Sequence, residues 1–393
     1  MKYVIVGSGV AGMTAAMDLA RQADAEIHIY TEEMYSYYYR PQVTNFLAGI
    51  MPLEKVIMRS PAWYEQKGIA LHLESRVARV EPAQQQMVLA GGEIVTYDRL
   101  LLTPGAHPFV PPIAGRDKQG VFTIRTLDDA AAIRAYAQQC ERAVVIGGGL
   151  LGLEAARGIQ GLGLAVTIVE LAPRLMPVQL DEPGAALLQH FVEAQGFTVM
   201  VGTSAQAIEG AERVERVVLQ DGRELAAELV VVATGVRPNT ALAEAAGLEV
   251  ARGIVVDAQL RTSAPHIYAA GDAAIFEGRC WGIAPIAQAQ ARIAAANMAG
   301  GLEAYVDIPP TTALKVLGIE VNALGETHSQ EEGVEALRFL DSEGGRYRKL
   351  VLREGQLVGA ITINDKGLAK ELAAKILDGV TLSSEAAQAL LTD

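Results

Sequence analysis

Two glycine-rich segments of the chain have the spacing Gly-x-Gly-x-x-Gly, which places main-chain N–H groups where they can hold a phosphate. The first segment is Gly7, Ser8, Gly9, Val10, Ala11 and Gly12, and the second contains Gly147, Gly149, Leu150, Leu151 and Gly152. In this pattern the first glycine permits a tight turn, the second lets the main chain approach a pyrophosphate, and the third lets the following helix pack against the preceding strand. The N-terminus of that helix adds N–H groups and the positive end of its dipole. Each segment therefore predicts a binding site for the pyrophosphate of a dinucleotide.

Acidic residues follow both segments at the distance where a carboxylate binds the ribose of such a dinucleotide. Glu32 lies 20 residues after the last glycine of the first segment, and its neighbour Glu33 competes for the same role. Glu170 lies 18 residues after the last glycine of the second segment. A carboxylate there accepts a bond from a free 2′-hydroxyl and repels a 2′-phosphate, so we expect NADH, with NADPH as the less favoured dinucleotide. Arg174 lies nearby and would weaken that repulsion.

The elements that position these residues form a repeat. Residues 2–33 and 142–171 each read as a short β-branched strand, the glycine-rich turn, an alanine- and leucine-rich helix, and a second strand that leads to an acid. This is one βαβ unit written twice, with an offset of 140 residues, which is far too long for a solenoid repeat. We expect an α/β fold with two Rossmann-like, three-layer ββα dinucleotide-binding domains and a small C-terminal α+β domain.

Proline-rich stretches mark the expected domain boundaries. The prolines between residues 108 and 112 indicate a crossing between domains. Pro309 and Pro310 precede a tail of short strands that closes with a helix near residues 366–377. We expect the first dinucleotide-binding domain over 1–112, a second one over 113–240, and the α+β domain over 311–393. The family resemblance described below implies that residues 241–310 return to the first domain, which would make it a discontinuous FAD-binding domain.

Composition excludes several other classes of protein. The 393 residues suffice for two or three domains, and the net charge of −13, from 33 basic and 46 acidic residues, argues against a nucleic-acid partner. No apolar run reaches the ~20 residues that a membrane helix needs, and the first apolar run leads into a glycine-rich turn, unlike a signal peptide. Cys140 and Cys280 have no neighbouring cysteine, so neither a disulfide framework nor a metal site is expected. A cytoplasmic protein without a membrane partner fits these features.

Short signatures outside the glycine-rich segments make a resemblance to a known family specific. Residues 265–272 read PHIYAAGD, residues 233–235 read ATG and residues 103–106 read TPGA. Over about residues 1–300 the chain resembles the FAD-dependent pyridine-nucleotide oxidoreductases, although that family usually has Ala-Thr where this chain has Thr103 and Pro104. The tail from about residue 312 to 382 resembles the C-terminal domain of NADH:rubredoxin oxidoreductases, and is similar to the reductase half of nitrite reductase large subunits.

The resemblance implies an FAD site in the first domain and an NADH site in the second. Asp272 would bind the ribityl chain of FAD, Arg40 would bind its pyrophosphate, and the helix that begins near Ala284 would direct its positive end at the flavin. Glu154 would orient the nicotinamide carboxamide of NADH. The other cofactor-binding residues that the resemblance and the glycine-rich segments imply are Glu32, Glu33, Pro41, Val77, Thr103, Pro104, Gly105, Arg125, Glu170, Gly235, Gly271 and Gln288.

The implied activity is that of an FAD-dependent NAD(P)H reductase. A hydride passes from NADH to flavin N5, and single electrons then pass to a rubredoxin- or ferredoxin-type carrier. Disulfide reductases of the family need a cysteine pair, and their relatives use one cysteine within a segment that corresponds to residues 34–60; both are missing here, so electrons would leave from the flavin itself. Two alternatives stay open: an NADH oxidase that uses oxygen, and a flavoprotein binding or assembly subunit with slow NADH oxidation. A homodimer is an open alternative to a monomer.

Basic residues of the tail have both a functional and a structural interpretation. Lys315 would lie over the flavin edge or meet an acidic carrier, and a plain surface lysine is the alternative. Arg346, Arg348, Lys349 and Arg353 form a basic cluster on a predicted hairpin. This cluster would dock an acidic carrier protein or, alternatively, form a solvated strand face.

Overall fold

The computed structural model describes residues 1–21, 25–308, 310–329, 331 and 333–392. Pro309, one of the two expected boundary prolines, lies outside the described residues. The chain divides into two compact units: Met1–Val43, Met51–His107 and Val236–Ile308 form the first, and Thr44–Ile50, Pro108–Gly235 and Pro309–Asp393 form the second. The first unit thus contains the first glycine-rich segment, and the second unit contains the second segment together with the C-terminal domain. The finer division into three domains stays a prediction.

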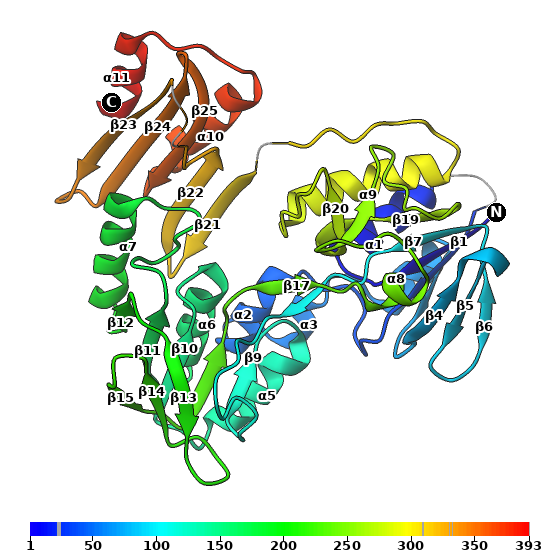
Figure 1. The fold of residues 1–393 in the computed structure, drawn as a ribbon, viewed down its shortest axis with the longest axis horizontal. Coiled ribbons are helices and arrows are strands. Elements are labelled where there is room, and N and C mark those ends of the chain that lie inside the picture. Colours follow the sequence, from blue (N-terminus) through cyan, green and yellow to red (C-terminus); the bar gives the residue numbers. More distant parts are fainter. Residues whose placement is uncertain (22–24, 309, 330, 332, 393) are drawn as a thin grey trace. The chain divides into compact units, whose positions relative to one another are not determined.

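A parallel sheet forms the centre of the first unit (Figure 1). Its strands are, in spatial order, β19 (Ile267–Ala269), β7 (Arg99–Leu102), β1 (Lys2–Val6), β2 (Glu26–Tyr30) and β3 (Ile69–His72). Helices α1 (Val10–Leu19) and α9 (Ala284–Met298) pack against each other and share one core with the sheet. The antiparallel strands β4 (Val77–Glu81), β5 (Gln86–Leu89) and β6 (Ile94–Thr96) contribute to the same core. The central strands are runs of Val, Ile and Leu because both faces of a parallel sheet are covered.

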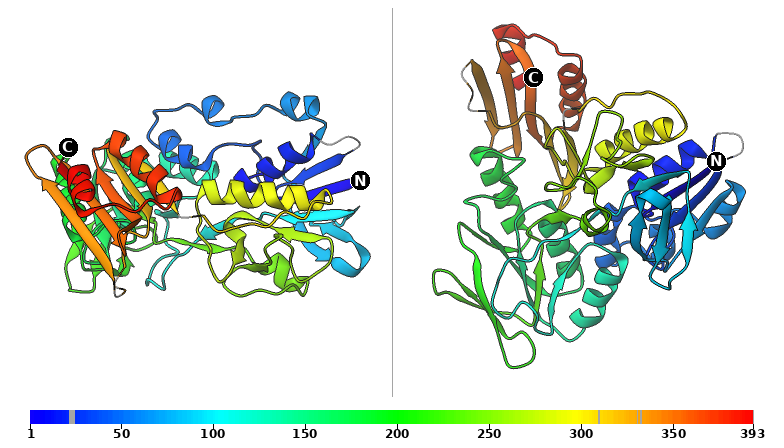
Figure 2. Two further views of the ribbon diagram at one scale, coloured as in Figure 1. Left: turned by 90° about the horizontal axis from the view of Figure 1, so that it is seen from above. Right: turned by 45° about the vertical axis from the view of Figure 1, so that its right-hand side comes forward.

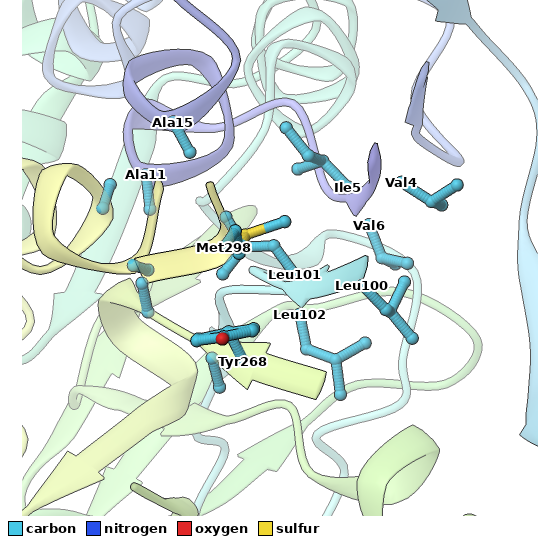
Figure 3. Close-up of a cluster of buried hydrophobic side chains, with 14 of the residues drawn as sticks. Val4, Ile5, Val6, Ala11, Ala15, Leu100, Leu101, Leu102, Tyr268 and Met298 are labelled. Atoms are coloured by element: carbon cyan, nitrogen blue, oxygen red, sulfur yellow. The ribbon is translucent and has the colours of Figure 1, made fainter. Parts of the chain in front are cut away.

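Small side chains let α1 approach the sheet closely. Ala11 and Ala15 of α1 are buried, and Figure 3 shows them in one cluster with Met298 of α9, Tyr268 of β19 and the strand residues 4–6 and 100–102. This close packing fixes the first turn of α1 at the carboxyl end of β1. In open parallel sheets ligands bind at that edge.

A second parallel sheet lies in the second unit. Its spatial order is β12 (Thr198–Val201), β11 (Ala165–Glu170), β10 (Arg142–Ile146), β16 (Leu229–Val232) and β9 (Val121–Thr123). The order β11-β10-β16 repeats the order β2-β1-β7 of the first unit, with α6 (Leu150–Gly161) in the place of α1. Helices α5 (Leu127–Ala137) and α7 (Glu182–Ala194) and the antiparallel strands β13 (Ala205–Glu209), β14 (Arg216–Leu219) and β15 (Glu224–Ala226) complete this part.

The C-terminal domain is an antiparallel sheet with helices on one face (Figure 2). The strand order is β21 (Thr311–Val316), β22 (Ile319–Gly325), β25 (Gln356–Ile363), β24 (Arg346–Arg353) and β23 (Val334–Asp341). Helices α10 (Lys366–Leu377) and α11 (Ser384–Thr392) share a core with Leu350, Leu352 and Leu357 of this sheet. Alternate residues of β24 point to opposite faces, so Tyr347 and Lys349 face away from these helices.

Shorter elements connect these layers. They are α2 (Val43–Leu47), α3 (Leu53–Val56), α4 (Pro61–Gln66), α8 (Ala241–Ala245), β8 (Ala106–Pro108), β17 (Val236–Pro238), β18 (Ile254–Val256), β20 (Ala274–Phe276) and the 3-10 turns η1 (Arg40–Gln42), η2 (Pro82–Gln84) and η3 (Gly271–Ala273). The predicted fold class is confirmed: both βαβ units and the α+β tail are present. None of the helices in the described part of the chain is both long and apolar enough to cross a membrane.

Candidate functional site

Close main-chain contacts hold the first glycine-rich segment against the end of β7. A Cβ on Gly7 would lie 2.1 Å from the carbonyl oxygen of Thr103, and a Cβ on Gly12 would lie 2.0 Å from that of Gly7. The Thr103 hydroxyl donates to the carbonyl oxygens of Val6 at 2.8 Å and Gly7 at 3.1 Å. The fold itself therefore requires Gly7 and Gly12. The Thr103 hydroxyl is therefore already used in hydrogen bonds to the main chain of the glycine-rich turn and its preceding strand.

The middle glycine of each segment, unlike Gly7 and Gly12, is not required by the fold, because the position that its side chain would occupy is empty. Gly9 (φ −70°, ψ −172°) and Gly149 (φ −78°, ψ −179°) have backbone angles that any residue adopts. Within the described residues, a Cβ on either one would meet no atom within 4 Å outside its chain neighbours. The protein alone would thus accommodate alanine at both positions. Glycine there leaves room for a ligand that approaches the main chain at the start of α1 or α6.

The turn that carries Asp272 lies beside the start of α1. Gly271 follows β19 with a φ of +79°, and a Cβ on it would lie 3.0 Å from the Ala11 Cβ. The Gly271 N–H donates to Oε1 of Gln290 at 2.9 Å, and the Gln290 side chain is buried on α9. No sequence motif marks Gln290, because its role depends on the packing of α9 beside α1. Of the predicted residues on α9, Ala284 begins the helix and Gln288 lies one turn later.

Arg40 lies in a network of charged and phenolic groups. Its Nη2 donates to Glu33 and its Nη1 to the Tyr38 hydroxyl at 3.0 Å, and that hydroxyl donates to the other Glu33 oxygen at 2.5 Å. Burial opposes the charge on Arg40, but Tyr38, Glu33 and Asp272 together raise the pKa of its guanidinium above its ordinary value. Arg40 and Asp272, both predicted to bind FAD, are therefore within electrostatic reach of each other in the first unit.

The structure separates the roles of the two adjacent acids. The Glu33 side chain is 15% exposed and pairs with Arg40. The Glu32 side chain is 71% exposed, and its carboxylate lies 3.8 Å from Nε of Arg76. An exposed carboxylate with a distant partner keeps lone pairs available for ribose hydroxyls. Glu32 therefore stays the first candidate for the ribose, while Glu33 anchors Arg40.

Glu170 ends β11 and is bonded to its own glycine-rich segment. Its Oε2 accepts from the Gly148 N–H at 2.6 Å, and its Oε1 accepts from the Ala172 N–H at 2.7 Å. These bonds hold the carboxylate at the carboxyl end of β11, where a ribose is expected. Arg174 donates to two main-chain carbonyl groups at 2.9 and 3.2 Å, so its guanidinium is engaged there and pairs with no carboxylate among the described residues.

Glu154 lies on α6, two residues after Gly152, and its side chain is 16% exposed. Its Oε1 accepts from the Leu317 N–H at 3.1 Å, and its Oε2 lies 3.7 Å from Arg157 Nη1. Burial raises the pKa of the Glu154 carboxyl above its usual value, while the Leu317 N–H and Arg157 oppose that rise. The result is an anchored carboxylate close to the second glycine-rich segment. Such a group suits an acceptor for an amide N–H.

The remaining predicted residues fall in both units. Pro41 lies in η1, Val77 begins β4, and Pro104 and Gly105 follow β7, all in the first unit. Arg125 precedes α5, Gly235 follows β16, and Lys315 is exposed on β21, all in the second unit. The predicted contacts of Arg125 and Lys315 with the flavin stay predictions.

Two residues of the basic cluster of the tail, Arg348 and Lys349, fit neither interpretation of it, because both are buried. Arg348 pairs with Asp365 and Lys349 with Asp181, and both basic side chains are about 5% exposed, at 6% and 5%. Arg346 pairs with Asp341, and Arg353 pairs with Glu326 and Glu331. The sequence suggested an open docking surface or a solvated strand face because Asp365 and Asp181, the partners of the two buried bases, come from other segments. Arg348 and Lys349 are instead buried in internal ion pairs, whereas Arg346 and Arg353, at 44% and 37% exposure, lie on the surface in ion pairs with neighbouring acids.

Comparison with known proteins identifies the class. Two Rossmann-like sheets, each with a glycine-rich turn before its first helix, define an oxidoreductase with two dinucleotide sites. Residues 1–299 match the family model described as pyridine nucleotide-disulphide oxidoreductase, and residues 310–380 match the rubredoxin NAD+ reductase C-terminal domain. The chain belongs to the pyridine nucleotide-disulphide oxidoreductase family and carries this C-terminal domain. The family resemblance inferred from the sequence is thus confirmed.

Individual relatives agree with this assignment. The chain is 37% identical over 378 residues to "Nitrite reductase [NAD(P)H]" of Bacillus subtilis (strain 168), covering 95% of this chain and 47% of that protein. It is 34% identical over 369 residues to the biphenyl dioxygenase system ferredoxin–NAD(+) reductase component of Paraburkholderia xenovorans (strain LB400), covering 92% and 89%. The crystal structure of the covalent putidaredoxin reductase–putidaredoxin complex aligns with a TM-score of 0.90 and 28% identity, covering 100% and 96%. The chain spans about half the length of the first curated relatives it matches.

Proposed function

We propose that this protein is an FAD-dependent NADH reductase that passes single electrons to a small rubredoxin- or ferredoxin-type protein. The observation that carries the proposal is the pair of open glycines, Gly9 and Gly149, since each leaves main-chain N–H groups at a helix start accessible to phosphates. Two such sites in one chain fit one dinucleotide that donates electrons and one that receives them. The similarity to the Paraburkholderia reductase and to putidaredoxin reductase supports a small carrier protein as the acceptor.

The residues of the first unit fit FAD. The N–H groups at the start of α1 and the Arg40 guanidinium would hold the pyrophosphate, Glu32 would hold the adenosine ribose, and Asp272 would accept from the ribityl hydroxyls. Gln290 keeps the Asp272 turn in place, and Glu33 keeps Arg40 in place. When bound, FAD supplies the capacity to take up a hydride and to release electrons one at a time.

The residues of the second unit fit NADH. The N–H groups at the start of α6 would hold its pyrophosphate, Glu170 its adenosine ribose and Glu154 its nicotinamide carboxamide. Hydride transfer needs no proton from a side chain, so these residues contribute binding and orientation. A cytoplasmic setting and a homodimer stay predictions.

Anaerobic stopped-flow absorbance tests the function. The FAD-loaded protein is reduced with one equivalent of NADH and mixed separately with rubredoxin, a plant-type ferredoxin, and oxygenated buffer. We expect rapid flavin reduction by NADH and rapid reoxidation by one carrier, with oxygen much slower. Reoxidation by oxygen that equals or exceeds both carriers would contradict the proposal and favour an oxidase. Absence of reduction by NADH would contradict the assignment of the second site.

Glu170→Gln is expected to narrow the preference for NADH over NADPH. The substitution removes the charge that repels a 2′-phosphate and keeps one oxygen for the Gly148 N–H, whereas the Ala172 N–H loses its acceptor. Loss of one charge-assisted hydrogen bond should raise the KM for NADH roughly tenfold, while the KM for NADPH falls. The measurement is the steady-state KM of flavin reduction with each dinucleotide. Glu212→Gln, an exposed carboxylate of the same unit, is the matched control. Equal changes for both dinucleotides would refute the role of Glu170.

A further inference from the structure

The turn between β21 and β22 has an unusual residue at its first position. β21 and β22 pair up to Val316 and Ile319, so Leu317 and Gly318 alone form the turn. Leu317 has a φ of +51° and Gly318 a φ of +88°. Two-residue turns with both φ values positive favour Asn-Gly or Asp-Gly, and a leucine in this region of backbone conformation is strained. The surroundings of Leu317 therefore have to hold it there.

Two side chains of the nucleotide-binding part hold both main-chain groups of Leu317. Its N–H donates to Glu154 Oε1 at 3.1 Å, and its carbonyl oxygen accepts from Gln195 Nε2 at 3.1 Å. Glu154 lies on α6 and Gln195 caps the C-terminus of α7, and all three residues belong to the second unit. The Leu317 side chain is also buried, at 5% exposure. The turn of the C-terminal domain is thus pinned to the helix that follows the second glycine-rich segment.

The Leu317 N–H is one of few groups that stabilise the Glu154 carboxylate. The charge of Arg157 lies 3.7 Å from the other oxygen of Glu154, beyond hydrogen-bonding distance. Burial raises the pKa of the Glu154 carboxyl, and the Leu317 N–H opposes that rise. Withdrawal of the turn would therefore make Glu154 easier to protonate and would release the rotation of its side chain.

We propose that the Leu317–Gly318 turn positions the Glu154 carboxylate, so that the C-terminal domain sets the affinity for the nicotinamide end of NADH. The inference rests on the proposed function, in which Glu154 accepts from the nicotinamide carboxamide. With Oε1 occupied by the Leu317 N–H, the lone pairs of Oε2 are left for the amide of the ligand. Leu317 is a positioning residue that acts through Glu154, and Gln195 steadies it from the opposite side.

Gln195→Ala tests the inference, since this exposed side chain can be removed without disturbing the core. The variant is combined with Glu154→Ala in a double-mutant cycle, and Gln189→Ala, on the same helix and bonded only to Glu193 among the described residues, is the control. Loss of one anchoring hydrogen bond should raise the Kd of NAD+ by roughly three- to tenfold in the wild-type background. In the Glu154→Ala background we expect no further change. FAD content should be unaffected.

A second readout is independent of flavin reduction. The Glu154 carboxyl is titrated by carbon NMR in the full-length protein without nucleotide, and we expect Gln195→Ala to move its midpoint to higher pH. The inference is overturned if the titration midpoint of Glu154 does not move, or if Gln195→Ala still changes the Kd of NAD+ in the Glu154→Ala background. In either case, normal reduction of the flavin by NADH leaves the proposed function intact. Wild-type protein that NADH does not reduce overturns the proposed function and the inference together.

Discussion

Gly9→Ala is expected to give a folded protein that no longer retains FAD, and Gly149→Ala a folded, FAD-loaded protein that NADH reduces poorly. The methyl group enters space that is empty in the protein but borders the first turn of α1 or α6. If pyrophosphates approach the main chain there, the methyl group meets the ligand. We expect the corresponding Kd to rise by roughly a hundredfold, or about 2.7 kcal/mol.

Stability separates this explanation from a folding defect. Both glycines have backbone angles that alanine adopts, so each variant should keep or gain up to ~1 kcal/mol in its free energy of unfolding. Gly12→Ala and Gly152→Ala would behave differently, because each Cβ would lie about 2 Å from a main-chain oxygen, at 2.0 and 1.9 Å. These variants should lose stability as well as ligand.

The measurements are bound FAD per protein, NAD+ titration and urea unfolding. Gly91→Ala in the first unit and Gly367→Ala in the second are matched controls. Apart from chain neighbours and the backbone of its own helix, a Cβ on either also meets no described atom within 4 Å, and neither has a positive φ. Both controls should bind FAD and NADH normally. Wild-type FAD content in Gly9→Ala, or wild-type NADH affinity in Gly149→Ala, would show that the open glycines do not face phosphates.

Asp181→Asn is expected to cost about 3 kcal/mol in the free energy of unfolding at neutral pH, because it breaks a buried ion pair on one side only. The Asp181 side chain is 11% exposed and lies at the N-terminus of α7, where it caps no helix N–H. Its oxygens accept instead from the Tyr347 hydroxyl at 2.8 Å and from Arg338 Nε at 3.0 Å, and lie 3.2 Å from Lys349 Nζ. Without the charge of Asp181, the buried Lys349 loses its counter-ion.

The same network predicts a pH dependence. Burial raises the pKa of the Asp181 carboxyl, but hydrogen bonds from Tyr347 and Arg338 and the charge of Lys349 outweigh it, so the pKa lies below its ordinary value. Stability from a carboxyl with a lowered pKa is fully present above the unfolded value of ~3.9 and is lost as pH falls through the folded pKa. The stability difference between wild type and Asp181→Asn should therefore stay constant from pH 7 to about 5 and shrink below about 4.

Urea unfolding of both proteins between pH 7 and pH 3 measures this difference. Asp117→Asn is the control, since that side chain is 96% exposed and should change stability little at any pH. A difference between wild type and Asp181→Asn that widens on acidification would mean that the carboxyl is destabilised by its burial. A difference near zero at pH 7 would mean that Lys349 becomes neutral at little cost.

The sequence by itself determined the parts whose geometry is local. Each glycine-rich turn, with the strand before it and the helix after it, lies within one contiguous segment of about thirty residues, so the spacing of residue types predicts its shape. The placement of Glu170 at the end of its strand, and of Glu154 on the helix after Gly152, follows from the same local register. The family, the fold class and the α+β tail could be predicted from the sequence for this reason.

Only the tertiary structure decided the roles that depend on partners from distant segments. It assigned Glu33 to Arg40 and left Glu32 exposed, although the two acids are adjacent in the sequence and both were candidates for the ribose. It brought Gln290 to Gly271, Leu317 to Glu154 and Tyr347 to Asp181, a pair separated by 166 residues. No periodicity or spacing encodes such contacts, because they arise when separately folded elements pack together. The prediction that Arg348 and Lys349 of β24 lie on the surface was wrong for the same reason, since Asp365 and Asp181, which neutralise them, are adjacent only after folding.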